Sequence, residues 1–251
     1  MTLNLWESLA YSRQKGIVPV VAEIKRVIPK LANKLGRDER DAASLTRCYQ
    51  TGGASGISLV TERKHFGGQP EMDIPAVLQA TSLPLLIKDF ILAREQIDYY
   101  AKLVSAVNSA WRRRVTLLLT AHLVKEQLPD LLQYVHAQGM LALVETRGPA
   151  DLPYLANLAR PPRLVGINNK NIDELEMGED LIRLNQEMLA AYRPVVGEAL
   201  ILSESAHQGP EDVQRSLTAG ADAVLAGTAF LIAADPTRTV ASFVQARRRF
   251  H

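Results

Sequence analysis

The sequence has 251 residues, 47% of them hydrophobic and 22% charged, which suits one large α/β domain. Its 29 basic and 27 acidic residues nearly cancel, and this balance argues against a protein that binds nucleic acid. With one cysteine, no basic-then-apolar leader and no apolar run near the roughly 18 residues of a membrane span, we expect a cytoplasmic protein without disulfides.

Short apolar runs rich in Val, Ile and Leu alternate with longer amphipathic stretches along the chain. The runs occupy residues 18–24, 56–61, 83–89, 115–120, 141–145, 164–168, 199–204 and 223–227. Continuous apolar runs are typical of parallel strands that are buried on both faces. Eight strands, each followed by a helical stretch, predict one domain, a (β/α)8 TIM barrel spanning residues 1–251, with residues 1–17 as a short N-terminal extension.

Helical patterns fill the gaps between these runs. Residues 94–107 carry an apolar stripe at helical spacing, and residues 125–139 end with a glycine that suits a C-cap. Residues 209–220 begin with a proline and two acids and end with a glycine, which are good start and stop signals. Cys48 falls in the helical pattern after the first strand, so we interpret it as a buried structural thiol.

Polar side chains gather where the apolar runs stop, which is the end of such a barrel that carries the active site. They are Glu23, Lys25, Lys88, Asp89, Glu145, Asn168, Asn169, Lys170, Ser203, Glu204 and Ser205. Residues i and i+2 of a strand face the same side, so Glu23 and Lys25 can both face the barrel mouth. A structural ion pair explains any one of them, but amines, carboxylates and an amide on one rim indicate general acid/base chemistry.

The loops after the last two strands predict a phosphate site, because backbone N–H groups and a short helix N-terminus often bind phosphate there. Gly227 allows close approach of an anion and Thr228 adds a hydroxyl, although Gly227 also suits a plain strand end. The histidines at positions 65, 122 and 207 are scattered without metal-ligand spacing, so we expect no metal. No phosphate-binding P-loop or dinucleotide motif indicates a cofactor.

Several of these segments together resemble the indole-3-glycerol phosphate synthases of tryptophan biosynthesis. The resemblance covers residues 18–236 and rests on VVAEIKR, GISLVTERKHFGG, LPLLIKDFILAREQI, ALVET, LVGINNKNI, LSES and GPEDVQRSLTAGADAVLAGTAFL. It implies a carboxy-lyase that closes a ring in 1-(2-carboxyphenylamino)-1-deoxyribulose 5-phosphate, with loss of carbon dioxide and water. The implied partner is this phosphorylated aryl-amino sugar, with no membrane or nucleic acid, and the oligomeric state stays open.

The resemblance also implies roles for residues that match the family motifs. Lys88 matches the principal general acid, and Lys25 matches the lysine that pairs with the substrate carboxylate and serves as a second acid. Glu145 matches the general base. Glu23 and Asn168 match the pair that holds the sugar hydroxyls.

Other positions concern substrate binding, and here the sequence both matches the family and departs from it. Phe66 matches an aromatic residue beside the aryl ring, and Glu204 and Ser205 match supporting polar residues. The departures are Ile28 and Lys30 in place of two serines, Lys170 in place of an arginine, and Ala206 in place of a glycine. Lys30 can supply charge toward phosphate, but as a flexible point charge.

Three interpretations of function remain open at this point. The first is the synthase itself. The second is a diverged paralogue that uses the same rim on a different aryl-amino sugar or a smaller substrate in a specialised pathway, which the departures support. The third is a non-catalytic barrel that binds a metabolite or a partner. Retention of Lys88 and Glu145 favours an enzyme, because an unused buried lysine costs stability.

Overall fold

The computed structural model describes residues 2–175 and 177–246. Eight parallel strands close into a barrel in sequence order, and β1 pairs with both β2 and β8, which confirms the predicted (β/α)8 fold. The strands are β1 (Val20–Ile24), β2 (Gly56–Val60), β3 (Leu85–Lys88), β4 (Val115–Thr120), β5 (Leu141–Thr146), β6 (Leu164–Asn168), β7 (Leu200–Glu204) and β8 (Ala223–Ala226).

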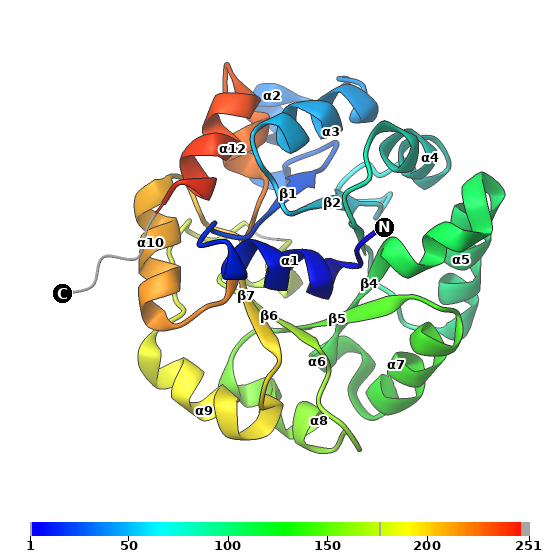
Figure 1. The fold of residues 1–251 in the computed structure, drawn as a ribbon, viewed down its shortest axis with the longest axis vertical. Coiled ribbons are helices and arrows are strands. Elements are labelled where there is room, and N and C mark those ends of the chain that lie inside the picture. The colour runs from blue at the N-terminus through cyan, green and yellow to red at the C-terminus, as the bar shows by residue number, and fades with distance from the viewer. Residues whose placement is uncertain (1, 176, 247–251) are drawn as a thin grey trace.

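Helices surround the strands as an outer ring (Figure 1). The α-helices are α1 (Leu5–Gln14), α2 (Ala32–Leu35), α3 (Ala42–Thr51), α4 (Pro70–Ala80), α5 (Arg94–Asn108), α6 (Ala121–Val124), α7 (Leu128–Ala137), α8 (Leu152–Ala156), α9 (Gln186–Val196), α10 (Pro210–Ala219), α11 (Thr228–Leu231) and α12 (Pro236–Val244). The 3-10 turns are η1 (Pro29–Leu31), η2 (Ser109–Arg114), η3 (Lys125–Gln127), η4 (Pro149–Asp151) and η5 (Ile172–Glu174).

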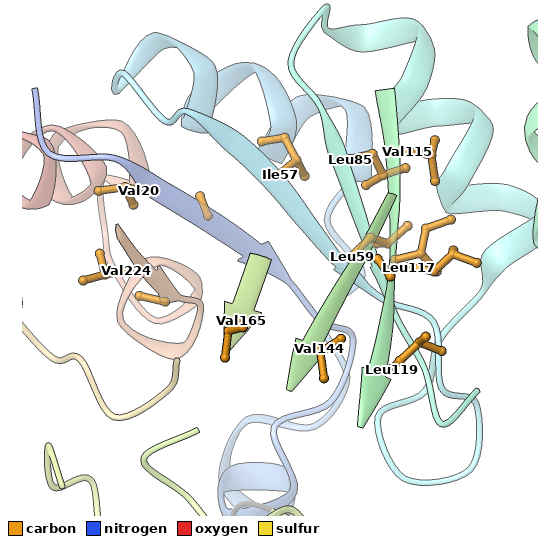
Figure 2. Close-up of a cluster of buried hydrophobic side chains, with 14 of the residues drawn as sticks. Val20, Ile57, Leu59, Leu85, Val115, Leu117, Leu119, Val144, Val165 and Val224 are labelled. Atoms are coloured by element: carbon orange, nitrogen blue, oxygen red, sulfur yellow. The ribbon is translucent and has the colours of Figure 1, made fainter. Parts of the chain in front are cut away.

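The alternation of side chains along each strand produces two separate apolar layers. One set faces outward and packs under the helices; Figure 2 shows Val20, Ile57, Leu117, Val144 and Val224 among its members. The other set faces the barrel interior and comprises Val21, Leu86, Leu118, Leu143, Leu164, Leu200, Leu202, Ala223 and Leu225. Because both faces are buried, the strands read as continuous apolar runs rather than as alternating ones.

Helix α1 lies across the end of the barrel at which the strands begin (Figure 1). Its Asn4 forms a capping box with Glu7, and its Leu5 and Leu9 are fully buried against the interior layer. The hydroxyl of Ser8 donates to the backbone oxygen of Ser55, just before β2, at 2.6 Å. Arg13 reaches Asp222, just before β8. Residues of the N-terminal segment therefore close the bottom of the barrel.

The boundaries of helix α10 agree with its start and stop signals in the sequence. Helix α10 begins at Pro210 and ends before Gly220, whose φ of 111° is a left-handed cap.

The thiol of Cys48 is less buried than its helical pattern predicts. The structure places Cys48 half-buried on α3, at the margin of the outer layer, so the expectation of a buried thiol was wrong in degree. Among the described residues, every helix is too short or too polar to cross a membrane.

Candidate active site

An ammonium group surrounded by carboxylates lies at the carboxyl end of the strands. Lys88 Nζ, at the end of β3, is 2.9 Å from Glu204 Oε2, 3.5 Å from Glu145 Oε2 and 3.6 Å from Glu23 Oε2. Lys25 Nζ lies 2.7 Å from Glu23 Oε1. These five residues, from β1, β3, β5 and β7, form what we call the charged cluster. It holds three carboxylates and two ammonium groups, all of them buried.

Alternation along the strands explains why these side chains meet. Glu23 follows the interior residue Val21 by two positions, and Lys88 and Glu145 likewise follow Leu86 and Leu143. The charged cluster is thus the layer directly above the apolar interior. A buried charge is costly unless it is paired, and here each charge has an opposite charge within 4 Å.

Neutral polar groups orient two of the carboxylates. Thr120 Oγ1 donates to Glu145 Oε1 at 3.2 Å, and Asn168 Nδ2 donates to Glu145 Oε2 at 3.2 Å. Ser58 Oγ donates to Glu23 Oε2 at 3.4 Å. Hydrogen bonds to both of its oxygens fix the plane of Glu145, so this carboxylate is held in one orientation toward the cluster.

Glu204 has the most enclosed environment of the cluster. Its side chain is 0% exposed, and among the described residues its Oε1 has no hydrogen-bond partner. That oxygen packs on Gly166 so closely that a Cβ built there would lie 1.7 Å away. Burial raises the pKa of Glu204; Lys88 counteracts this rise, and the charge of Glu145 adds to it. Glu204 therefore takes up a proton at a higher pH than an exposed glutamate does.

A small cavity opens on one side of the cluster. It measures about 30 Å³, and its apolar walls are Val60, Phe66, Phe90, Leu118 and Ile172. Glu62 accepts hydrogen bonds from the N–H groups of Lys64, His65 and Phe66, and this turn holds the Phe66 ring in place. Lys25 Nζ lies 5.7 Å from the centre of that ring, within cation–π range.

A larger cavity, of about 320 Å³, opens on the other side. The loops after β7 and β8 line it with Ser205, Ala206, Gly227 and Thr228, among others, and Lys30 and Lys170 reach it from the loops after β1 and β6. Glu23 and Lys25 line both cavities, so the two spaces meet at this pair.

The loop after β7 has an unusual backbone. Ser205 and Ala206 have φ angles of 63° and 64°, a left-handed conformation that costs L-residues about 1 kcal/mol each. Asn169 stabilises it, because its Nδ2 donates to the backbone oxygen of Glu204 at 2.9 Å. Gly227 is needed for a different contact: a Cβ there would lie 2.9 Å from Glu23 Cβ, so the glycine lets β8 pack against the charged cluster.

The structure thus brings the sequence-predicted site residues to one end of the barrel, on the walls of one or both cavities or beside them. Ser203 is the exception, because its hydroxyl faces outward and accepts a hydrogen bond from Ser216 of α10 at 3.0 Å. Asn168 lies beside the cluster rather than in it, and its Oδ1 accepts from the Lys170 N–H at 3.0 Å. Ile28, one of the departures, lines a neighbouring groove instead of the larger cavity.

Sequence reasoning did not single out Ser58, Thr120 or Asp180. It named Asn169 but not the hydrogen bond by which this residue stabilises the loop after β7. Ser58 and Thr120 are polar residues inside apolar runs, a signal that points to an interior position. Each also lies opposite its partner in the strand register, Ser58 beside Glu23 and Thr120 beside Glu145.

Within the described ranges, no group of three His, Cys, Asp or Glu residues is arranged to hold a metal ion. The imidazole of His122 instead meets the Asp173 carboxylate at 2.9 Å, and His207 meets the Ser216 hydroxyl at 2.9 Å.

Comparisons with known proteins agree with this geometry. The family model described as indole-3-glycerol phosphate synthase matches residues 1–243. A protein of that name from Pyrococcus furiosus is 34% identical over 91% of this chain and 92% of its own length. Proteins of that name from Kineococcus radiotolerans and Methanopyrus kandleri are each 35% identical, over 94% and 92% of this chain and 78% and 84% of their own lengths.

A solved structure, the N-acetylmannosamine-6-phosphate 2-epimerase from Clostridium perfringens, is similar in fold. It has a TM-score of 0.59 and 14% sequence identity, and the match covers 86% of this chain and 90% of that one. At this identity the likeness concerns the barrel alone, whereas the family model and the curated relatives extend over nearly the whole sequence. The chain belongs to the indole-3-glycerol phosphate synthase family.

Proposed function

We propose that this protein is an indole-3-glycerol phosphate synthase of tryptophan biosynthesis, a carboxy-lyase acting on 1-(2-carboxyphenylamino)-1-deoxyribulose 5-phosphate. The observation that carries the proposal is the charged cluster between two cavities of different character. One cavity has apolar, aromatic walls, and the other has lysines and the loops after β7 and β8. A substrate with an aryl group at one end and a phosphate at the other matches both.

The aryl ring of the substrate enters the smaller cavity, beside Phe66. The aryl carboxylate then meets Lys25, which lies next to the Phe66 ring. The phosphate binds in the larger cavity, near Lys30, Lys170 and the loop residues Ala206, Gly227 and Thr228.

The reaction forms a bond between the aryl carbon that bears the carboxylate and the ketone carbon of the sugar. In our proposal the Lys88 ammonium donates a proton to the ketone oxygen as this bond forms. Carbon dioxide then leaves, which restores the aromatic ring. Loss of water completes the indole: an ammonium group protonates the departing hydroxyl, and Glu145 removes a proton from the methylene carbon next to nitrogen, so that the ring double bond forms and the N–H is kept.

The remaining cluster residues support these steps. In our proposal Glu23 and Asn168 hold the sugar hydroxyls between the two cavities. Glu204 acts on Lys88, because its Oε2 lies 2.9 Å from the ammonium and orients it toward the ketone. Ser205 follows Glu204 in the chain and lines the larger cavity, so polar residues continue from the charged cluster into that cavity.

Incubation of the purified protein with the carboxyphenylamino substrate tests the proposal, with indole fluorescence as the readout. We expect a turnover number of about 1 per second or higher. A Lys88→Met protein purified in parallel controls for contaminating synthase. If the substrate binds and no indole product forms, the proposed activity is wrong.

A further inference from the structure

The carboxylate of Asp180 bridges two lysines at the edge of the larger cavity. Its Oδ1 lies 2.5 Å from Lys170 Nζ, and its Oδ2 accepts a hydrogen bond from Lys30 Nζ. The three residues come from different parts of the chain: Lys30 from η1, Lys170 from the loop after β6, and Asp180 from the loop before α9. All three line the same cavity as Ala206, Gly227 and Thr228.

Two ammonium groups that converge beside the loops after β7 and β8 are suited to an anion. In this protein the chain itself supplies one. The Asp180 side chain is 18% exposed, so it is mostly withdrawn from water and seated between the lysines. A carboxylate carries one charge, whereas a phosphate monoester carries up to two and offers three acceptor oxygens.

We propose that Asp180 is an internal competitor for the substrate phosphate, which must displace its carboxylate from Lys30 and Lys170, and that Asp180 thereby sets how tightly the site holds phosphate. This inference rests on the proposed function, because it assigns the phosphate of the substrate to the larger cavity. It also gives Lys30 and Lys170 a shared role, since both change partner when phosphate arrives.

The loop that carries Asp180 is anchored on either side of it. Upstream, the Asp173 carboxylate binds His122 at 2.9 Å and Arg147 at 3.0 Å. Downstream, the N–H groups of Arg183 and Leu184 donate to Asn169 Oδ1 at 2.9 and 3.0 Å. Displacing the Asp180 carboxylate from the two lysines requires none of these contacts to break.

The ionic state of Asp180 is consistent with this role. Burial alone raises its pKa, but the hydrogen bonds and charges of Lys170 and Lys30 outweigh burial and hold the pKa of Asp180 below its ordinary value. The carboxylate is therefore charged at neutral pH, and an incoming phosphate competes with a full negative charge.

Titration calorimetry with inorganic phosphate, without substrate, measures the competition directly. The Asp180→Asn variant keeps the shape of the side chain and removes its charge. We expect it to bind phosphate about tenfold more tightly than the unchanged protein, because the ion pairs of this carboxylate with Lys170 and Lys30 no longer compete. The same variant should lower the KM of the phosphorylated substrate.

Glu179→Gln is the matched control, because Glu179 is the exposed neighbour in the same loop and its loss changes the net charge equally. Its dissociation constant for phosphate should equal that of the unchanged protein. Asp180→Ser serves as a second variant, and thermal unfolding of both shows that they are folded.

Equal or weaker phosphate binding by both Asp180 variants would overturn the inference and would mean that Asp180 positions the lysines. Tightening by Glu179→Gln to the same degree would also overturn it, since net charge alone would then account for the effect. Neither result bears on turnover, so the proposed function stands or fails by its own assay.

Discussion

Replacing Lys88 with methionine removes the ammonium that lies within 3.6 Å of three buried carboxylates. Methionine keeps most of the volume of the lysine stem, so the packing changes little. What changes is the charge: three carboxylates then share the single ammonium of Lys25. We expect no indole formation, because no acid remains next to the ketone oxygen, and a loss of stability that depends on pH.

The size of that loss follows from proton uptake. With one cation fewer, one further carboxyl of the charged cluster must stay protonated in the folded variant. Each carboxyl that does so costs about 1.36 kcal/mol per pH unit above the ordinary glutamate pKa of about 4.3. The variant should therefore lose about 3.7 kcal/mol of unfolding free energy at pH 7 and about 1 kcal/mol at pH 5.

The direction of this pH dependence follows from the linkage between proton binding and folding. A carboxyl whose pKa is raised in the folded state contributes stability that is present below the unfolded pKa and is lost as pH rises toward the folded pKa. Glu204, whose pKa burial raises, already gives the unchanged protein this trend, and the variant should show it more steeply. Urea unfolding at pH 5 and pH 7 measures both proteins.

Lys102→Met is the matched control, because it makes the same substitution at an exposed position of α5. It should leave turnover and the pH trend unchanged. Near-normal turnover by Lys88→Met would refute the acid assignment, and a stability loss equal at both pH values would refute the proton-uptake argument.

Two further substitutions examine the carboxylates. Glu145→Gln keeps the side-chain shape and an acceptor for Thr120 but turns an NH2 toward the Asn168 NH2, so unfolding free energy should fall by about 1–3 kcal/mol while turnover falls about 100-fold or more; retained turnover would contradict the base assignment. Gly166→Ala puts a Cβ 1.7 Å from Glu204 Oε1, which forces Glu204 off Lys88, so both turnover and stability should fall, the latter by about 1–3 kcal/mol. Gly178→Ala, with nothing within 4 Å of its Cβ, is the control, and equal behaviour of the two variants would show that Gly166 has no such role.

Most of the barrel could be predicted because its strands are buried on both faces. Such strands need continuous apolar runs, and the sequence shows eight of them. The direction of Glu23 followed from its spacing to Val21 and Lys25, since alternation along a strand is a local property. The polar ends of the runs likewise located the rim that carries Lys88, Glu145 and Glu204.

The parts that could not be predicted depend on contacts between distant segments. Thr120 orients Glu145 only because β4 and β5 pair in one register, which no local pattern specifies. Asp180 lies in a polar loop without periodicity, and nothing near it in the sequence indicates Lys30 as its partner. The half-burial of Cys48 depends on how α3 is rotated against the barrel, which its helical pattern leaves open.

The helix beneath the barrel has a consequence for folding. Besides Ser55 and Asp222, α1 meets Arg113, just before β4, through Glu7, and Arg163, just before β6, through the ring of Trp6. Its docking surface is complete only when segments from both ends of the chain have assembled. Helix α1 should therefore dock after the strands have assembled, so Trp6, 4.8 Å from Arg163, is an intrinsic fluorescent reporter of ring closure.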